Sequence, residues 1–204
     1  MRLVLVAVLA LAAAPVLAQQ APKGPPGAPD PSRVVAGTYK VDTGHTQVLF
    51  TVSHLGFSLY TGQFTQPTGS LTLDPKNPAA DKVEISFPIA KVSTTVDGLN
   101  AHLQKPEFFD AAQFPEGKFV STKVTVSGTT ATIEGNLTLK GVTKPVVLDA
   151  HFVGAGAAPM GPPKVNVGFA ATTTIKRSDF GISYGIPLVS DKVDLVINAA
   201  FAAE

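Results

Sequence analysis

The chain has 204 residues and no cysteine, and its formal net charge of +1 falls to zero without the N-terminal segment that carries Arg2, because 15 Lys and Arg then face 15 Asp and Glu. The absence of cysteine excludes disulfides, thiolate metal sites and cysteine nucleophiles. The balanced charge disfavours nucleic acid and anionic membrane surfaces as main partners.

The N-terminal region has the features of an exported protein. Residues 1–18 (MRLVLVAVLALAAAPVLA) join an early Arg2 to an apolar run and small terminal residues, the pattern of a secretory signal peptide. The run is short for a membrane helix, so we expect no stable span after cleavage. Residues 19–37 are rich in proline and glycine and predict a flexible linker. The folded domain is expected over residues 38–204.

From Thr46 onward, apolar residues recur at every second position, which is the period of a strand with one buried face. In TQVLFTVSH, for example, Val48, Phe50 and Val52 share a face with His54. The same period is found in five further segments: 82–90, 130–141, 145–154, 164–176 and 192–201. Turn-forming residues separate these segments.

This pattern predicts an all-β, antiparallel protein of about eight strands. A sandwich or a closed barrel would each enclose the apolar faces, but closure removes exposed edges and favours a barrel with room for one ligand. Only two segments can be helical. The first, 97–112, is limited to short turns by Pro106, and the second is a turn at 177–180.

No catalytic or metal-binding pattern stands out. The sequence GISYG, 181–185, matches the nucleophile motif Gly-x-Ser-x-Gly around Ser183, but that motif needs a following helix, and Pro187 comes next. The four histidines lack metal-ligand spacing. His54 faces inward and has two readings, a hydrogen-bonded residue at a strand end or a polar contact to a ligand head group. We therefore expect no enzyme activity, no cofactor and no metal.

Four motifs occur in order along the chain: HTQVLFTVSHLGFSLYTGQF, HLQKPEFFDAAQFP, GNLTLKGVTKPVVL and IKRSDFGI. Together they closely resemble the YceI-like family of bacterial lipid-binding proteins, over residues 39–201. The resemblance implies an elongated, lipocalin-like β-barrel with one short helical crossover. It also implies a periplasmic location and an apolar tunnel for a long isoprenoid-type lipid, such as a polyprenyl chain, a quinone or a fatty amide.

One position departs from the family pattern. Family members commonly have Arg-Asp before the Ala-His-Leu element, whereas this chain has Leu99-Asn100. The replacement shifts the expectation toward a ligand with a neutral head group. A homodimer remains possible.

The alternation and the resemblance together predict which side chains contact the lipid. The predicted ligand-binding residues are Phe50, Val52, His54, Phe57, Leu71, Ile85, Phe87, His102, Phe108, Phe109, Leu137, Leu148, Phe169 and Phe180. Ordinary core packing by the rings of the 100–115 segment stays open beside ligand contact. The alternative to a lipid carrier is a structural or partner-binding barrel whose interior is filled by its own side chains.

Overall fold

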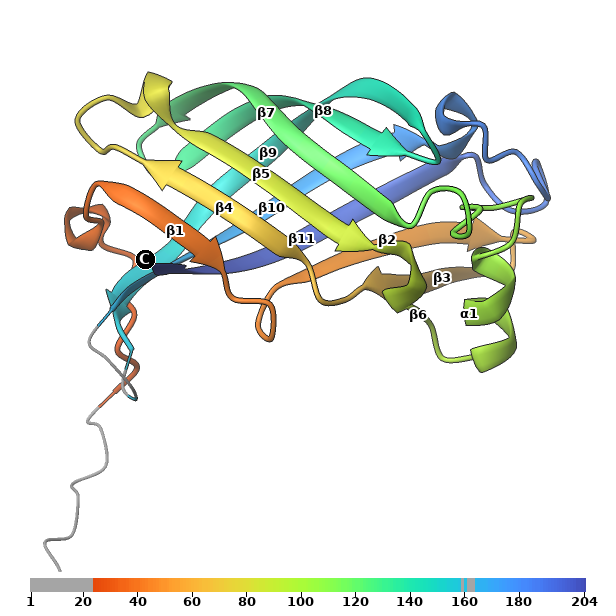
Figure 1. Ribbon diagram of the computed structural model, residues 1–204, viewed down its shortest axis with the longest axis horizontal. Coiled ribbons are helices and arrows are strands. Elements are labelled where there is room, and N and C mark those ends of the chain that lie inside the picture. The colour runs from red at the N-terminus through yellow and green to blue at the C-terminus, as the bar shows by residue number, and fades with distance from the viewer. Residues whose placement is uncertain (1–23, 159, 161–163) are drawn as a thin grey trace, which may run out of the picture.

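The computed structural model describes residues 24–158, 160 and 164–204, so the predicted signal peptide lies outside the described residues. The fold is a closed, eight-stranded antiparallel barrel with a single short α-helix, α1 (Asp97–Leu103), at one end (Figure 1). Its strand segments are β1 (Gly37–Val41), β2 (Gln47–His54), β3 (Ser58–Phe64), β4 (Thr68–Leu73), β5 (Lys82–Pro88), β6 (Val92–Ser93), β7 (Glu116–Ser127), β8 (Thr130–Leu139), β9 (Val142–Ala157), β10 (Val165–Lys176) and β11 (Lys192–Ala203). The predicted fold class is therefore confirmed.

Eleven segments make eight strands because three strands are interrupted. β1 and β2 both pair with β11, and they form two halves of one strand. β4 pairs with β1 and β3 pairs with β2, so β3 and β4 are the two halves of the next strand. β5 pairs with β4 and β6 pairs with β3, which gives the third interrupted strand. The barrel closes through the pairing of β1 with β11. Closure leaves few free backbone edges, which is the physical advantage expected of a barrel.

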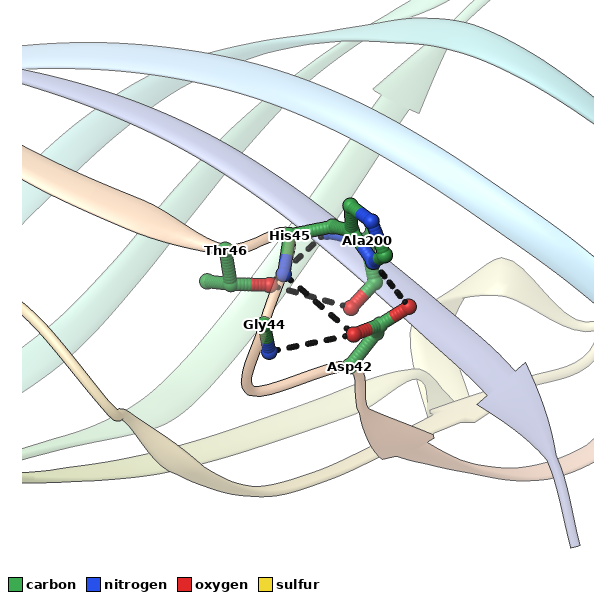
Figure 2. Close-up of polar contacts among 5 residues, drawn as sticks. All are labelled: Asp42, Gly44, His45, Thr46 and Ala200. Atoms are coloured by element: carbon green, nitrogen blue, oxygen red, sulfur yellow. Dashed lines mark hydrogen bonds and ion pairs between the residues drawn. The ribbon is translucent and has the colours of Figure 1, made fainter.

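The break between β1 and β2 is held by the side chains of a five-residue turn (Figure 2). The Asp42 carboxylate accepts hydrogen bonds from the backbone N–H groups of Gly44 and His45, at 3.1 and 3.2 Å. The buried hydroxyl of Thr46 donates to the carbonyl of Ala200 at 3.1 Å and accepts from its N–H at 3.0 Å. Thr46 thus replaces a backbone partner in the ladder of β11 where the strand is interrupted.

The predicted inward faces are confirmed in the long strands. Val48, Phe50 and Val52 of β2 line the interior, as do the alternating apolar residues of β8, β10 and β11. Two bulges shift this parity. In β7 the register changes between Ser121 and Lys123, and in β9 Val153 has no partner on β10. A bulge moves the following residues to the opposite face, which hides the period in the sequence.

Part of the predicted flexible linker is attached to the barrel. Ala28 and Ala155 exchange two backbone hydrogen bonds, at 3.1 and 2.9 Å. Gly154 and Gly156 have no side chain, which lets the backbone of residues 26–28 lie directly against β9. The pairing is possible because β8 pairs with β9 only as far as His151.

The crossover expected over 97–112 is a short helix followed by turns. α1 ends at Leu103, three residues before Pro106. Asn100, one of the two residues that depart from the family pattern, accepts hydrogen bonds from the backbone N–H and the hydroxyl of Thr94, at 2.6 and 2.8 Å. The predicted turn at 177–180 is the 3-10 helix η4 (Arg177–Phe180). No helix of the described residues has the length and apolar character needed to cross a bilayer.

Candidate binding cavity

The interior of the barrel contains a cavity of about 730 Å³. Its lining includes Pro31 and Pro78 at one end of the barrel and Tyr184 and Gly185 at the other. Small-molecule sites in proteins range from about 300 to 1,000 Å³. The cavity is therefore large enough for a ligand, and it follows the length of the barrel.

Most of the residues predicted from the sequence to contact a ligand meet in this cavity. Two do not. Phe57 lies on the turn between β2 and β3 with 89 % of its surface exposed, and Phe180 is 1 % exposed within the packed core beside the cavity. The predicted residues that line the cavity are Phe50, Val52, His54, Leu71, Ile85, Phe87, His102, Phe108, Phe109, Leu137, Leu148 and Phe169.

Aromatic rings form much of the wall. Phe64 is the centre of one group, with its ring 5.6 Å from that of Phe50, 4.9 Å from Phe87 and 5.4 Å from Phe109. A second group at the opposite end joins Phe169 to the rings of Phe152 and Phe201. Tilted and edge-to-face contacts of this kind add to the energy of burial.

The mouth beside α1 combines aromatic rings with hydrogen-bonding groups. The rings of His102 and Phe108 are 4.9 Å apart, and Tyr184 contacts both of them. His102 Nε2 lies 2.9 Å from Glu107 Oε1. The backbone N–H of Glu107 and then His102 lower the pKa of the Glu107 carboxyl, so the carboxylate stays charged at neutral pH. This mouth therefore offers hydrogen-bonding rings at the edge of an apolar interior.

Formal charges contribute little to the lining. The acidic and basic residues among the lining positions are Asp81, Lys82 and Arg177, all at strand ends or connections. Arg177 is turned to the protein itself, because its guanidinium donates to the carbonyls of Ser190, Ile182, Tyr184 and Val189 at 2.8–3.1 Å. Burial lowers the pKa of the Arg177 guanidinium below its usual value, and the group remains a cation at physiological pH. Four of its five N–H groups therefore hold the 181–190 loop.

The surroundings of Ser183 do not form a nucleophile elbow. The residue is exposed in the 181–190 loop, which continues in turns where that motif needs a helix. In the described part of the chain, no three His, Asp or Glu side chains are grouped so that they could hold a metal ion.

Several lining residues were not found from the sequence. Phe119 belongs to β7, where the bulge conceals the alternation. Tyr60 and Phe64 belong to β3, whose inward positions are occupied by Tyr60, Gly62 and Phe64. Tyr184 lies in a loop and reaches His102 only through tertiary packing. The period of β3, read over a window that allows glycine as an inward residue, would have identified Tyr60 and Phe64.

Comparisons with known proteins agree on one family. The model of the YceI-like domain matches residues 39–201. A UPF0312 protein of Enterobacter sp. (strain 638) is 42 % identical over 166 residues, covering 80 % of this chain and 85 % of the relative. Protein YceI of Salmonella arizonae is 41 % identical, with 80 % and 86 % covered.

Solved structures show the same barrel. The YCEI protein of Campylobacter jejuni aligns with a TM-score of 0.66 at 30 % identity, covering 74 % of this chain and 90 % of that one. Burkholderia cenocepacia BcnA aligns at 0.67 with 22 % identity, over 78 % and 98 %. A polyisoprenoid binding domain from Saccharophagus degradans aligns at 0.58 with 17 % identity, over 81 % and 98 %. The chain belongs to the YceI-like family.

Proposed function

We propose that this protein is an exported, non-catalytic carrier that holds a long isoprenoid-type lipid in the barrel, in the periplasm. The observation that carries the proposal is the 730 Å³ cavity walled by Val, Ile, Leu and Phe side chains. The polyisoprenoid binding domain among the structural neighbours supports this ligand class. The signal-peptide pattern of residues 1–18 supports export.

Apolar burial alone can account for binding of such a ligand. Each buried CH₂ contributes roughly 0.8 kcal/mol, so about 20 carbons contribute on the order of 16 kcal/mol. Association costs about 4–15 kcal/mol. A short or polar ligand would need several good polar contacts to offset that cost. A long amphiphile needs few polar contacts, because its apolar chain supplies most of the binding energy.

The mouth beside α1 favours a neutral head group. Leu99 stands where the family commonly has Arg, and it lines the cavity. Arg177 donates four of its five N–H groups to backbone carbonyls. The side chains left to meet a head group at this mouth are His54, Tyr60, His102 and Tyr184, which can hydrogen-bond a quinone, an alcohol or an amide.

Two neighbouring positions on β10 provide a matched test. Ala171 lines the cavity and Thr172 is exposed on the outer surface. In Ala171→Phe, the added ring occupies part of the cavity, whereas in Thr172→Phe it lies outside. Purified proteins would be extracted with organic solvent, and the extracts analysed by mass spectrometry. We expect wild type and Thr172→Phe to carry a long-chain lipid and Ala171→Phe to carry several-fold less.

The result also separates the carrier from the filled structural barrel. Circular dichroism would establish that both variants fold. If wild-type protein carries no lipid and takes up no fluorescent prenyl alcohol, the carrier role is wrong. Equal lipid in folded Ala171→Phe and wild type would show that the lipid binds elsewhere.

A further inference from the structure

Large apolar side chains are concentrated outside the cavity at one end of the barrel. Twelve such side chains are exposed among the described residues, and half of them belong to the turn after β2, the start of β3, the residue before α1 and the 181–190 loop. Phe57 is 89 % exposed, Leu59 74 % and Leu188 65 %. The six residues, here called the apolar rim, are Leu55, Phe57, Leu59, Val96, Tyr184 and Leu188.

Hydrogen bonds join the segments of the apolar rim. The N–H of Leu55 donates to the carbonyl of Leu188 at 2.7 Å, which fixes the β2–β3 turn to the 181–190 loop. The hydroxyls of Tyr60 and Thr95 are 3.3 Å apart, which ties β3 to the residue before Val96. In Figure 1, α1, the end of β2 and the blue loop between β10 and β11 lie at the same end of the barrel.

The rim segments carry no formal charge. Residues 53–66, 92–96 and 182–190 contain no Asp, Glu, Lys or Arg, although such residues make up 15 % of the chain. The opposite end differs, because the connection from β4 to β5 carries Asp74, Lys76, Asp81 and Lys82. In the described structure, the uncharged apolar surface of these segments lies at one of the two ends of the cavity, beside the paired His102 and Glu107.

The apolar rim continues into the cavity. Tyr184 belongs to both, since it is exposed on the rim and also lines the cavity. His54 lines the cavity and precedes Leu55, while Tyr60 lines it and follows Leu59. A hydrocarbon chain can therefore pass from the rim to the interior along the side chains of the rim segments, which carry no charge.

We infer that the apolar rim docks on the surface of a lipid bilayer and that the ligand enters and leaves the cavity there. The inference rests on the proposed carrier function, because a long-chain lipid is held in bilayers and exchanges poorly through water. Phe57 stands on a three-residue turn with Leu55 and Gly56 in left-handed conformations, at φ 55° and 71°. Such a protruding tip suits insertion among head groups, and Tyr184 is a residue type enriched at that depth.

Vesicle binding tests the inference with the full mature protein. Phosphatidylcholine vesicles would be floated through a density gradient with wild type, Phe57→Ser/Leu59→Ser, or Val147→Ser/Val153→Ser. The control residues are exposed to about half on the outer wall of β9, and none of the four substituted positions lines the cavity. We expect the rim variant to lose about tenfold or more in vesicle partition. The control should match wild type, and added salt should have little effect, because the rim has no charge.

A second measurement keeps the two proposals separate. A fluorescent prenyl alcohol would be supplied either in the same vesicles or in detergent micelles. Slower loading of the rim variant from vesicles, with equal final loading from micelles, supports docking. Wild-type protein that carries lipid but does not float with vesicles overturns docking and leaves the carrier role intact. Floating protein that carries no lipid overturns the carrier role and, with it, ligand entry at the rim, and supports only the contact of the rim with the bilayer. Light scattering would also show whether wild type is a dimer. If the rim variant is a monomer where wild type is a dimer, and it still binds vesicles, the rim is a self-association surface and the inference is wrong.

Discussion

The ring of Phe87 lies against the backbone of Gly117, its direct partner on the neighbouring strand β7. A Cβ at Gly117 would overlap two ring atoms of Phe87. The ring of Phe50 lies in the same way against its partner Gly62 on β3. The ring of Phe119 lies against Gly135 on β8, which is the diagonal neighbour of Phe119. Inward-facing glycines thus make room beside the wall for the rings, which would otherwise project further into the cavity.

Gly117→Ala is therefore expected to displace the Phe87 ring. Overpacking of this kind costs about 1–3 kcal/mol, which urea unfolding would measure as a lower free energy of unfolding. The matched control is Gly98→Ala on α1, where a Cβ meets nothing within 4 Å. That control should leave stability unchanged or raise it by up to about 1 kcal/mol. Equal stability of Gly117→Ala and wild type would show that the ring can move at no cost.

Thr46→Val should destabilise the protein through the break between β1 and β2. The substitution keeps the shape of the side chain and removes the hydroxyl that bonds both backbone groups of Ala200. Leaving the buried N–H of Ala200 without its partner costs about 1–3 kcal/mol. Thermal denaturation compared with Thr132→Val, at an exposed position of β8, measures the difference. A loss as small as that of Thr132→Val would mean that another group replaces the hydroxyl.

Arg177→Met should loosen the 181–190 loop at the mouth beside α1. Four carbonyls lose a charged donor, and hydrogen bonds to charged groups contribute about 1.5–3 kcal/mol each, though not additively. We expect a loss of about 2–4 kcal/mol and faster amide hydrogen exchange in the loop. Arg33→Met is the control, because Arg33 is exposed and its pairing with Asp30 contributes less than about 1 kcal/mol. Unchanged exchange in Arg177→Met would contradict the role of Arg177 in the loop.

Asp191 should make the loop sensitive to acid. The Asp191 carboxylate accepts hydrogen bonds from the N–H and the hydroxyl of Ser178, both at 2.8 Å. The backbone N–H of Ser178 is the main cause that lowers the pKa of Asp191 below its usual 3.8. A lowered folded-state pKa adds stability above the unfolded-state value, and this stability is lost as the pH falls through the folded-state value. The gain is below about 1 kcal/mol, because solvent screens the group.

Urea unfolding at pH 6 and pH 3 would measure this effect in wild type and in Asp191→Asn. Wild type should be the more stable at pH 6, and the difference should be smaller at pH 3, below the unfolded-state pKa of the carboxyl. A difference that is the same at both pH values would exclude the carboxylate as its source.

The apolar period predicted the barrel because a strand places successive side chains on opposite faces. In β2, for example, the alternation alone assigns Val48, Phe50 and Val52 to the interior, where the structure places them. The period is less informative where a bulge interrupts a strand. The bulge in β7 is the reason that Phe119 was not predicted as a lining residue. The period also failed at turns, because Phe57 lies on the turn just before β3 and is exposed.

The local sequence determined which residues form strands, which face of each strand is apolar and which loops carry no charge. These properties depend only on residues within a few positions of one another along the chain. Only the tertiary structure decided that the apolar faces enclose a cavity of about 730 Å³ and not a filled core. Closure pairs β1 with β11 across more than 150 residues, and the space inside depends on rings and glycines that meet across strands. The mouth likewise joins α1 to a loop 80 residues further along the chain, a contact that no local pattern encodes.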